Sequence, residues 1–270
     1  METTTVHPSP RGESARPPAT SGAGPGFGII VLGSFRSGTS LVCQLLDRFG
    51  VDFGPPDSLR TGDKFNPGGY YERGDVNHLN GRLVESAGRT FADPGSPGKL
   101  AEAADPRVFD EADLGWMQND ACWGLKDPRL CATLAAWVAA GRIDPARTRI
   151  VHVQRSAEAV ARSAMKYPGV NHYFGNAPEA ICRGVEEYAR LAQWHVDHLG
   201  IDTFTVQYEE LLEHPRRVVA ELARFIGVHD RRLIRRAAAE VGKKKAHLRL
   251  AAKRFARRLG RLAGGIFGMP

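Results

Sequence analysis

Residues 27–40 read FGIIVLGSFRSGTS, and this stretch indicates the fold class. Residues 28–32 form a short, unalternating apolar run that ends at Gly33, which is typical of a parallel strand buried on both faces. A helix is predicted to follow, because apolar residues recur at three- to four-residue spacing at Leu41, Val42, Leu45, Leu46 and Phe49. A strand, a glycine-rich loop and a helix in this order offer backbone N–H groups and a positive helix end to an anion.

The chain beyond this stretch alternates predicted strands with predicted helices. Strands are expected over residues 122–127 (CWGLKD), 148–155 (TRIVHVQR) and 202–208 (DTFTVQY), and helices over 130–140, 157–166, 178–199 and 215–227. Ser156 is expected to cap the second of these helices. This alternation predicts a doubly wound, mostly parallel α/β sheet of P-loop type with helices on both faces, whose ligands bind beyond the carboxyl ends of the strands.

The composition divides the chain into three parts, and the second of them contains an insertion. Residues 1–27 are rich in Pro, Gly, Ser and Thr and are expected to be disordered. The α/β domain is expected over residues 28–229. Within it, residues 51–121 break into Pro- and Gly-rich turns with short helices near 75–87 and 106–119, so we expect an insertion that shapes the substrate site. Residues 230–270 are expected to be a basic, amphipathic, helical tail.

The net charge of +7 is distributed unevenly. Residues 231–270 hold 13 of the 37 basic residues and a single acid, Glu240, so the rest of the chain carries a net charge of −5. Nucleic-acid binding by the body is therefore not indicated. The tail pattern over residues 243–270 predicts a basic amphipathic helix that binds an anionic membrane surface, binds an acidic partner, or packs on the body.

The chain shows no signal for export or for a membrane span. No apolar run approaches the about 20 residues that a membrane-spanning helix needs, and the N-terminus lacks the apolar core of a secretory signal. The four cysteines have neither C-x-x-C spacing nor zinc-type histidine neighbours. We expect a cytoplasmic protein, and membrane attachment is one of the alternatives for the tail, which would then hold the protein at the inner membrane face.

The loop after the first strand nearly matches the phosphate-binding pattern G-x-x-x-x-G-K-[ST]. Thr39 stands where nucleoside triphosphatases place a lysine, and Arg36 supplies a cation three positions earlier. A phosphate ligand is expected here, but an ordinary nucleoside triphosphatase is not. The alternative is a Gly/Ser turn that only joins a strand to a helix.

A second group of residues follows the strand at 148–155. Arg155 ends this strand, and Ser163 comes eight residues later, about two turns into the next helix, where its hydroxyl could reach the same phosphate. No aspartate stands where many nucleotide-binding enzymes hold magnesium. Two cationic positions without a metal carboxylate fit a ligand that is phosphorylated at two separate places. The alternative is a solvated arginine and an ordinary helical serine.

These residues resemble those of the sulfotransferases that use 3′-phosphoadenosine 5′-phosphosulfate (PAPS). FRSGTSL (35–41) is similar to their phosphosulfate-binding loop. Arg155 and Ser163 are similar in position and spacing to the pair of residues with which those enzymes bind the 3′-phosphate. WGLKDPRL (123–130) and YEELLEHP (208–215), the latter followed by RFIGV (224–228), resemble segments of bacterial members. The resemblance implies PAPS as the donor, adenosine 3′,5′-bisphosphate as the product, and no essential metal.

The resemblance also implies residue roles. The 5′-phosphosulfate would lie on Arg36, Ser37, Gly38, Thr39 and Ser40, and the 3′-phosphate on Arg155 and Ser163. Lys126 ends a predicted strand and would neutralise the charge that builds on the bridging oxygen, although an ion pair with Asp127 is the alternative role.

Three residues are candidates for the general base that accepts the proton of the acceptor hydroxyl. Glu72 lies in an acid-bearing segment (NPGGYYE) common in similar bacterial sequences, Asp57 falls where tyrosylprotein sulfotransferases carry a catalytic glutamate, and His78 is a third candidate. Each could instead be an ordinary turn or surface residue.

The expected reaction is in-line transfer of a sulfuryl group to a hydroxyl of a small metabolite, a glycan or a lipid-linked acceptor. Residues 51–121 and 167–175 are expected to line the acceptor site, where rings could stack on a sugar or an aromatic group: Tyr70, Tyr71, Tyr173 and Phe174. The alternatives are a P-loop nucleotide kinase or other phosphotransferase, and a non-catalytic module that binds membrane or nucleic acid.

Overall fold

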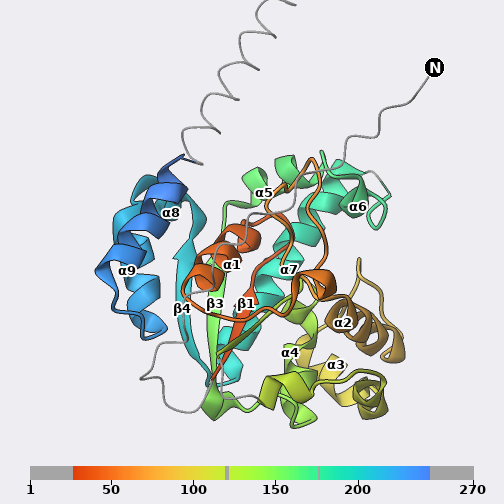
Figure 1. Ribbon diagram of the computed structural model, residues 1–270. Coiled ribbons are helices and arrows are strands. Elements are labelled where there is room, and N and C mark those ends of the chain that lie inside the picture. The colour runs from red at the N-terminus through yellow and green to blue at the C-terminus, as the bar shows by residue number, and fades with distance from the viewer. Residues whose placement is uncertain (1–26, 119–121, 176, 244–270) are drawn as a thin grey trace, which may run out of the picture.

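The computed structural model describes residues 27–118, 122–175 and 177–243. Its centre is a four-stranded parallel sheet in the order β2-β1-β3-β4 (Figure 1). The strands are β1 (Gly28–Leu32), β2 (Trp123–Lys126), β3 (Thr148–Gln154) and β4 (Asp202–Gln207). The parallel register pairs Gly28 with both Trp123 and Thr148, so the carboxyl ends of β2, β1 and β3 lie at the same end of the sheet.

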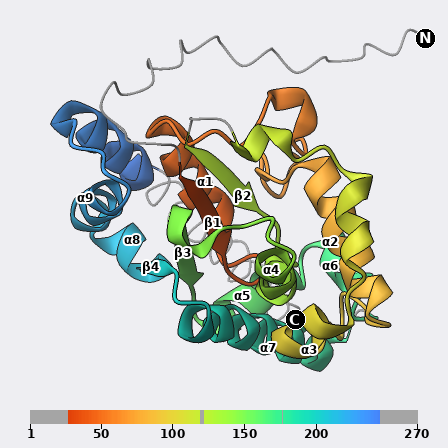
Figure 2. The same cartoon turned by 90° about the horizontal axis from the view of Figure 1, so that it is seen from below.

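Helices cover both faces of this sheet (Figure 2). Ile30, Leu32 and Ile150 point to one face, where they pack with α2 (Gly74–Ser86), α3 (Pro97–Ala103), α4 (Leu130–Ala139), α5 (Ala157–Ala164) and α7 (Pro178–His198). Ile29, Val31 and Val151 point to the other, where they pack with α1 (Thr39–Arg48), α8 (Tyr208–Glu213) and α9 (Pro215–Phe225). Burial on both faces explains why the β1 sequence is apolar without alternation.

The predicted α/β fold is confirmed, and most predicted boundaries lie within two residues of the observed ones. Ser156 caps α5 by accepting a hydrogen bond from the Ala159 N–H at 3.4 Å. The strand predicted to end at Tyr208 ends at Gln207, and Tyr208 begins α8 instead.

The long connection from α1 to β2 contains short helices and isolated bridges. Besides α2 and α3 it forms the 3-10 helices η1 (Pro56–Ser58), η2 (Pro106–Glu111) and η3 (Gly115–Gln118), while residues 119–121 lie outside the described ranges. The remaining short elements are η4 (Pro145–Arg147) and α6 (Pro168–Asn171).

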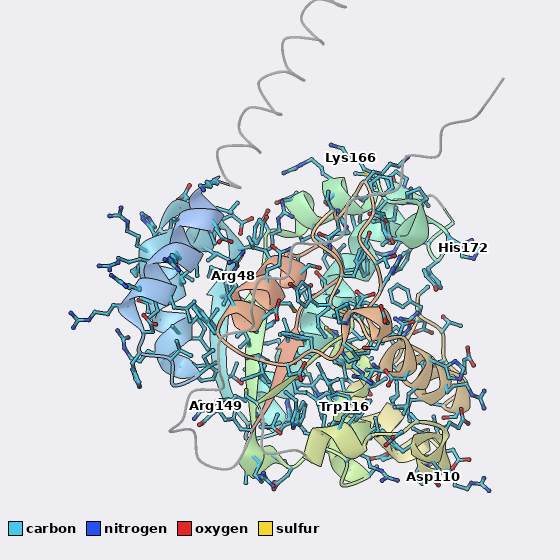
Figure 3. The ribbon with its side chains drawn as sticks, in the orientation of Figure 1. Arg48, Asp110, Trp116, Arg149, Lys166 and His172 are labelled. Atoms are coloured by element: carbon cyan, nitrogen blue, oxygen red, sulfur yellow. The ribbon has the colours of Figure 1, made fainter. Side chains whose placement is uncertain are left out.

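Residues 231–243 are helical and pack on the core through Ala237, Ala238 and Val241. Glu240 pairs with Arg48 of α1 at 2.5 Å, and Arg48 is labelled in Figure 3. The predictions for residues 1–26 and 244–270 fall outside the described residues. Of the helices in the described ranges, none has the length and apolar character to cross a bilayer.

The strand order places a switch point between β1 and β3. The chain leaves β1 toward β2 on one side and leaves β3 toward β4 on the other. Connections that diverge in this way open a crevice outside the carboxyl ends of the two strands, which is where ligands of doubly wound sheets bind. The loops after β1 and β3 carry Arg36 and Arg155 respectively.

Candidate functional site

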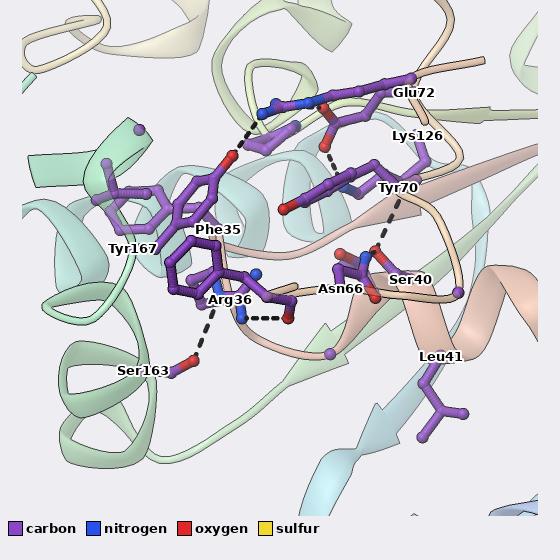
Figure 4. A pocket seen from close by; sticks show the side chains of 18 of the residues that line it. Phe35, Arg36, Ser40, Leu41, Asn66, Tyr70, Glu72, Lys126, Ser163 and Tyr167 are labelled. Atoms are coloured by element: carbon purple, nitrogen blue, oxygen red, sulfur yellow. Dashed lines mark hydrogen bonds and ion pairs between the residues drawn. The ribbon is translucent and has the colours of Figure 1, made fainter. Parts of the chain in front are cut away.

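A cavity of about 870 Å³ lies at the carboxyl edge of the sheet (Figure 4). All four strands bring a side chain to it. Arg36 follows β1, Lys126 ends β2, Arg155 follows β3 and Tyr208 follows β4. The cavity is thus built from segments that are far apart in the sequence.

The lining of the cavity is strongly cationic. Among the described residues that line it, Glu72 is the single acid, and six carry positive charge: Arg36, Arg60, Lys64, Lys126, Arg129 and Arg155. The side chains around them include the rings of Phe35, Phe65, Phe91, Tyr70, Tyr167 and Tyr173. Such a lining suits an anionic ligand with flat or apolar parts.

The loop between β1 and α1 has a backbone shape that its glycine permits. Gly38, the N-cap of α1, has φ +103°, and a Cβ at this position would overlap the Tyr208 ring. Arg36 adopts φ +64°, which is uncommon for a residue with a side chain. This turn presents Gly38, Thr39 and Ser40 to the cavity at the N-terminus of a helix, where the first N–H groups have no intrahelical acceptor.

Arg36 and Arg155 meet across the switch point. Arg155 Nη1 donates to the Arg36 carbonyl oxygen at 3.1 Å, and its guanidinium lies 4.5 Å from the Tyr208 ring centroid. Glu209 lies 3.8 Å from Arg155 Nε. The two guanidinium groups that were expected at opposite ends of one ligand therefore line one cavity.

Ser163 was expected to act together with Arg155, but its hydroxyl contacts Arg36 instead. Arg36 Nε donates to Ser163 Oγ at 3.3 Å, and Arg36 Nη2 donates to the Phe65 carbonyl oxygen at 3.2 Å (Figure 4). Arg36, Arg155 and Ser163 all line the cavity.

Ser40 and Ser37 have different positions in the loop. Ser40 Oγ donates to the Tyr70 carbonyl oxygen at 3.4 Å and accepts from Asn66 Nδ2 at 3.0 Å. Ser37 was expected to contact the ligand, but it is buried outside the lining, and its N–H donates to the Ser34 carbonyl oxygen at 3.2 Å.

Lys126 forms a buried ion pair with Glu72. The Lys126 ammonium donates to Glu72 Oε1, and Arg60 Nη1 lies 3.4 Å from Glu72 Oε2 (Figure 4). Arg60 also donates to the Tyr167 hydroxyl and lies 4.3 Å from the Tyr70 ring centroid. Lys126 and Glu72 are about as buried as the apolar side chains of the core, with exposed fractions of 6% and 5% respectively.

The partner of Lys126 is therefore Glu72 and not Asp127, which was the alternative. Asp127 instead accepts hydrogen bonds from the Arg129 N–H at 2.7 Å and from Asn77 Nδ2 at 2.9 Å. Burial raises the pKa of Asp127, although the Arg129 charge opposes the shift. Asp127 orders the turn into α4, as expected for a structural residue.

Two candidate bases and two candidate rings lie outside the cavity lining. Asp57 is exposed in η1, and exposed His78 on α2 faces Glu111 at 3.8 Å. Tyr71 packs on Phe53 with ring centroids 5.3 Å apart, and Phe174 is buried in the core. Of the candidate bases, the structure brings Glu72 to the cavity.

Arg60, Asn66 and Arg129 line the cavity but were not predicted as site residues from the sequence. Asn66 has no motif around it, and its role depends on the contact with Ser40 across 26 positions. Arg129 stands in WGLKDPRL three positions after Lys126, so its position just beyond a strand end was a usable signal.

A model of the sulfotransferase family matches residues 28–231. Among solved structures, the chain is similar to the sulfotransferase domain from the curacin biosynthetic pathway, with 16% identity, 78% of this chain and 76% of that chain covered, and a TM-score of 0.46. A sulfotransferase from Mycobacterium tuberculosis H37Rv has 16% identity, coverages of 79% and 71%, and a TM-score of 0.44. The sulfotransferase domain of the Synechococcus PCC 7002 olefin synthase has 19% identity, coverages of 77% and 75%, and a TM-score of 0.42. A comparison with curated protein sequences found no match.

Proposed function

Because the chain belongs to the sulfotransferase family, we propose that it transfers the sulfuryl group of PAPS to a hydroxyl of an acceptor. The observation that carries this proposal is the meeting of Arg36 and Arg155 in one cavity at the switch point between β1 and β3. Two guanidinium groups on neighbouring strand ends suit an adenosine that carries anionic groups at two positions.

The residues around the switch point fit such a donor. Arg36 and the N-terminal amides of α1 at Gly38, Thr39 and Ser40 would hold the 5′-phosphosulfate. Arg155 and Ser163 would hold the 3′-phosphate, and Ser163 would then exchange its contact with Arg36 for one with the ligand. The donor carries roughly four negative charges near neutral pH, which matches the cationic lining of the cavity.

In this proposal, the Glu72–Lys126 pair acts between the donor and the acceptor, since both residues line the cavity. In the proposed in-line displacement, the acceptor oxygen forms a bond to sulfur while the bond from sulfur to the bridging oxygen breaks. Glu72 accepts the proton of the attacking hydroxyl, and Lys126 with Arg36 stabilises the charge left on the bridging oxygen of the product. Arg60 orients the second carboxylate oxygen of Glu72.

Binding of the reaction product tests the donor site directly. We expect adenosine 3′,5′-bisphosphate to raise the melting temperature without magnesium, while ATP with magnesium has little effect. Arg36→Ala and Arg155→Ala should each weaken this binding by roughly 30-fold or more, since each loses a charge-assisted contact. Arg107→Ala is the matched control, because Arg107 is exposed and its ionic partner among the described residues is nearby Asp105. Donor-product affinity that is unchanged in both site variants would overturn the assignment.

The C-terminal segment is proposed to bind an anionic membrane surface, on the sequence pattern of residues 243–270 alone, and the protein would then act in the cytoplasm at the inner membrane face. A chain that ends at Lys243 keeps the helical residues that pack on the core. We expect the full chain to co-sediment with vesicles containing anionic lipid in a salt-sensitive way, and the shortened chain to lose this binding. Equal binding by both chains would contradict this role.

A further inference from the structure

Arg129 lies on the opposite side of the cavity from Arg155. It follows β2, which is an edge of the sheet, whereas Arg155 follows β3, and β1 runs between these two strands. Neighbouring strands are about 4.8 Å apart, so the two strand ends are separated by roughly 10 Å. A nucleotide held at the β1/β3 switch point does not need Arg129, and the charge of Arg129 is left for another anion.

The guanidinium of Arg129 has few partners within the protein. Its one ionic contact among the described residues is with Asp127 Oδ1 at 3.5 Å, while the Asp127 carboxylate is already engaged by the Arg129 N–H and by Asn77. The Arg129 side chain is only 16% exposed, yet it lines the cavity. A guanidinium has five N–H donors, and a desolvated one with a single long contact is suited to a forked bond with an oxyanion.

Aromatic rings flank this cation. The Arg129 guanidinium carbon lies 5.0 Å from the Phe91 ring centroid, and the Phe91 and Tyr173 ring centroids are 4.5 Å apart. Both rings line the cavity, and Tyr173 is 45% exposed, unusually high for a large apolar side chain in this protein. An exposed ring beside a cation suits a flat or apolar ligand body that carries a negative group.

We infer that Arg129, Phe91 and Tyr173 form an acceptor subsite that selects a hydroxyl-bearing aromatic acid. The inference rests on the proposed sulfotransferase function, because it assigns the hydroxyl to the Glu72–Lys126 pair and the anionic group to Arg129, three positions after Lys126 in the chain. A carboxylate and a phosphonate share the oxyanion chemistry that a guanidinium binds. The donor supplies the sulfuryl group, so the subsite only positions the acceptor.

The preference for an acid can be measured by the binding of matched ligands, with no need for the transfer reaction to occur. The full chain is saturated with adenosine 3′,5′-bisphosphate and titrated calorimetrically with 4-hydroxyphenylacetate, its neutral amide, and 4-hydroxybenzylphosphonate. We expect the acid to bind at least about tenfold more tightly than the amide, since one charge-assisted forked bond is lost in the amide. The ratio of phosphonate to acid affinity tells which oxyanion the subsite prefers.

Three variants assign the selection to Arg129. In Arg129→Gln the acid and the amide should bind within about twofold of each other, and Arg129→Lys should keep part of the preference, because a lysine retains the charge without the fork. Arg107→Gln removes an exposed arginine and should leave the preference unchanged.

The outcomes separate the two proposals. If adenosine 3′,5′-bisphosphate does not bind the wild-type protein, the proposed function fails. If it binds and the acid and amide then bind equally or not at all, the subsite inference alone fails. Preference for the acid that persists in Arg129→Gln, with nucleotide binding intact as evidence of folding, also overturns the subsite.

Discussion

Glu72 is held by two cations that differ in burial. Lys126 is 5% exposed in its side chain and Arg60 is 49% exposed, so one partner is shielded from water and the other reaches it. Buried pairs lose several kcal/mol when one partner is removed, because the remaining charge is left uncompensated. The pair therefore serves both the stability of the cavity wall and the proposed proton transfer, and substitutions must separate the two.

Glu72→Gln keeps the shape of the side chain and removes its ability to accept a proton. We expect kcat to fall by about 100-fold or more while the affinity for adenosine 3′,5′-bisphosphate changes by about twofold or less. Asp57→Asn is the control, since Asp57 is exposed and outside the cavity lining. If Asp57→Asn lowers kcat and Glu72→Gln does not, Glu72 is only the counter-ion of Lys126.

At the scale of the elements, the loop between β1 and α1 depends on Tyr208 of α8. The Tyr208 ring lies against Gly38 on one side and against the Arg155 guanidinium on the other. A residue from the end of β4 thus fixes the positions of groups that follow β1 and β3. This contact explains why the loop needs glycine at position 38 for reasons of space as well as of φ.

Gly38→Ala is expected to lose donor binding as well as stability. A left-handed conformation costs an L-residue about 1–2 kcal/mol, and the added methyl group also displaces Tyr208. Gly50→Ala is a matched control, since Gly50 has φ +93° and open space around its Cβ position. Thermal unfolding should show a larger loss for Gly38→Ala, and only that variant should lose affinity for adenosine 3′,5′-bisphosphate. Equal behaviour of the two variants would mean that the Tyr208 contact is unimportant.

The elements were predictable where local sequence determines them. The strand from Gly28 to Leu32 and the helix from Pro178 to His198 follow from an apolar run and from helical periodicity, each ended by glycine. The pairing of Glu72 with Lys126 spans 54 positions and was not predicted, because it depends on how the long connection after α1 folds back over the loop. The contact of Ser163 with Arg36 was missed for the same reason, since it depends on the packing of α5.

At the scale of the whole molecule, two histidines are enclosed in the core. Burial lowers the pKa of His152 on β3 to about 4 and the pKa of His195 on α7 to about 3, although Asp197 opposes the shift at His152. In the unfolded chain a histidine titrates near pH 6.5, so between pH 6.5 and about 4 the unfolded chain binds more protons than the folded one. Their contribution to stability is present above pH 6.5 and is lost as the pH falls.

Unfolding by denaturant at pH 7.5, 6.0 and 5.0 should therefore show a free energy of unfolding that declines on acidification. His195→Gln should flatten this decline, because the variant has one proton fewer to take up on unfolding. His198→Gln is the control, since His198 is exposed and stacks on Trp194. A slope that is the same in His195→Gln and in the wild type would show that other groups cause the acid sensitivity.

The cavity joins two kinds of wall with different origins. Arg36, Lys126, Arg155 and Tyr208 are anchored at strand ends, so their relative positions are tied to the hydrogen-bonded sheet. Phe65, Phe91 and Tyr173 come from connecting segments that the sheet does not constrain. In the proposed function, lengthening or exchanging those segments would change which acceptor is chosen and leave the proposed nucleotide half of the cavity intact, so acceptor choice could diversify independently of the chemistry.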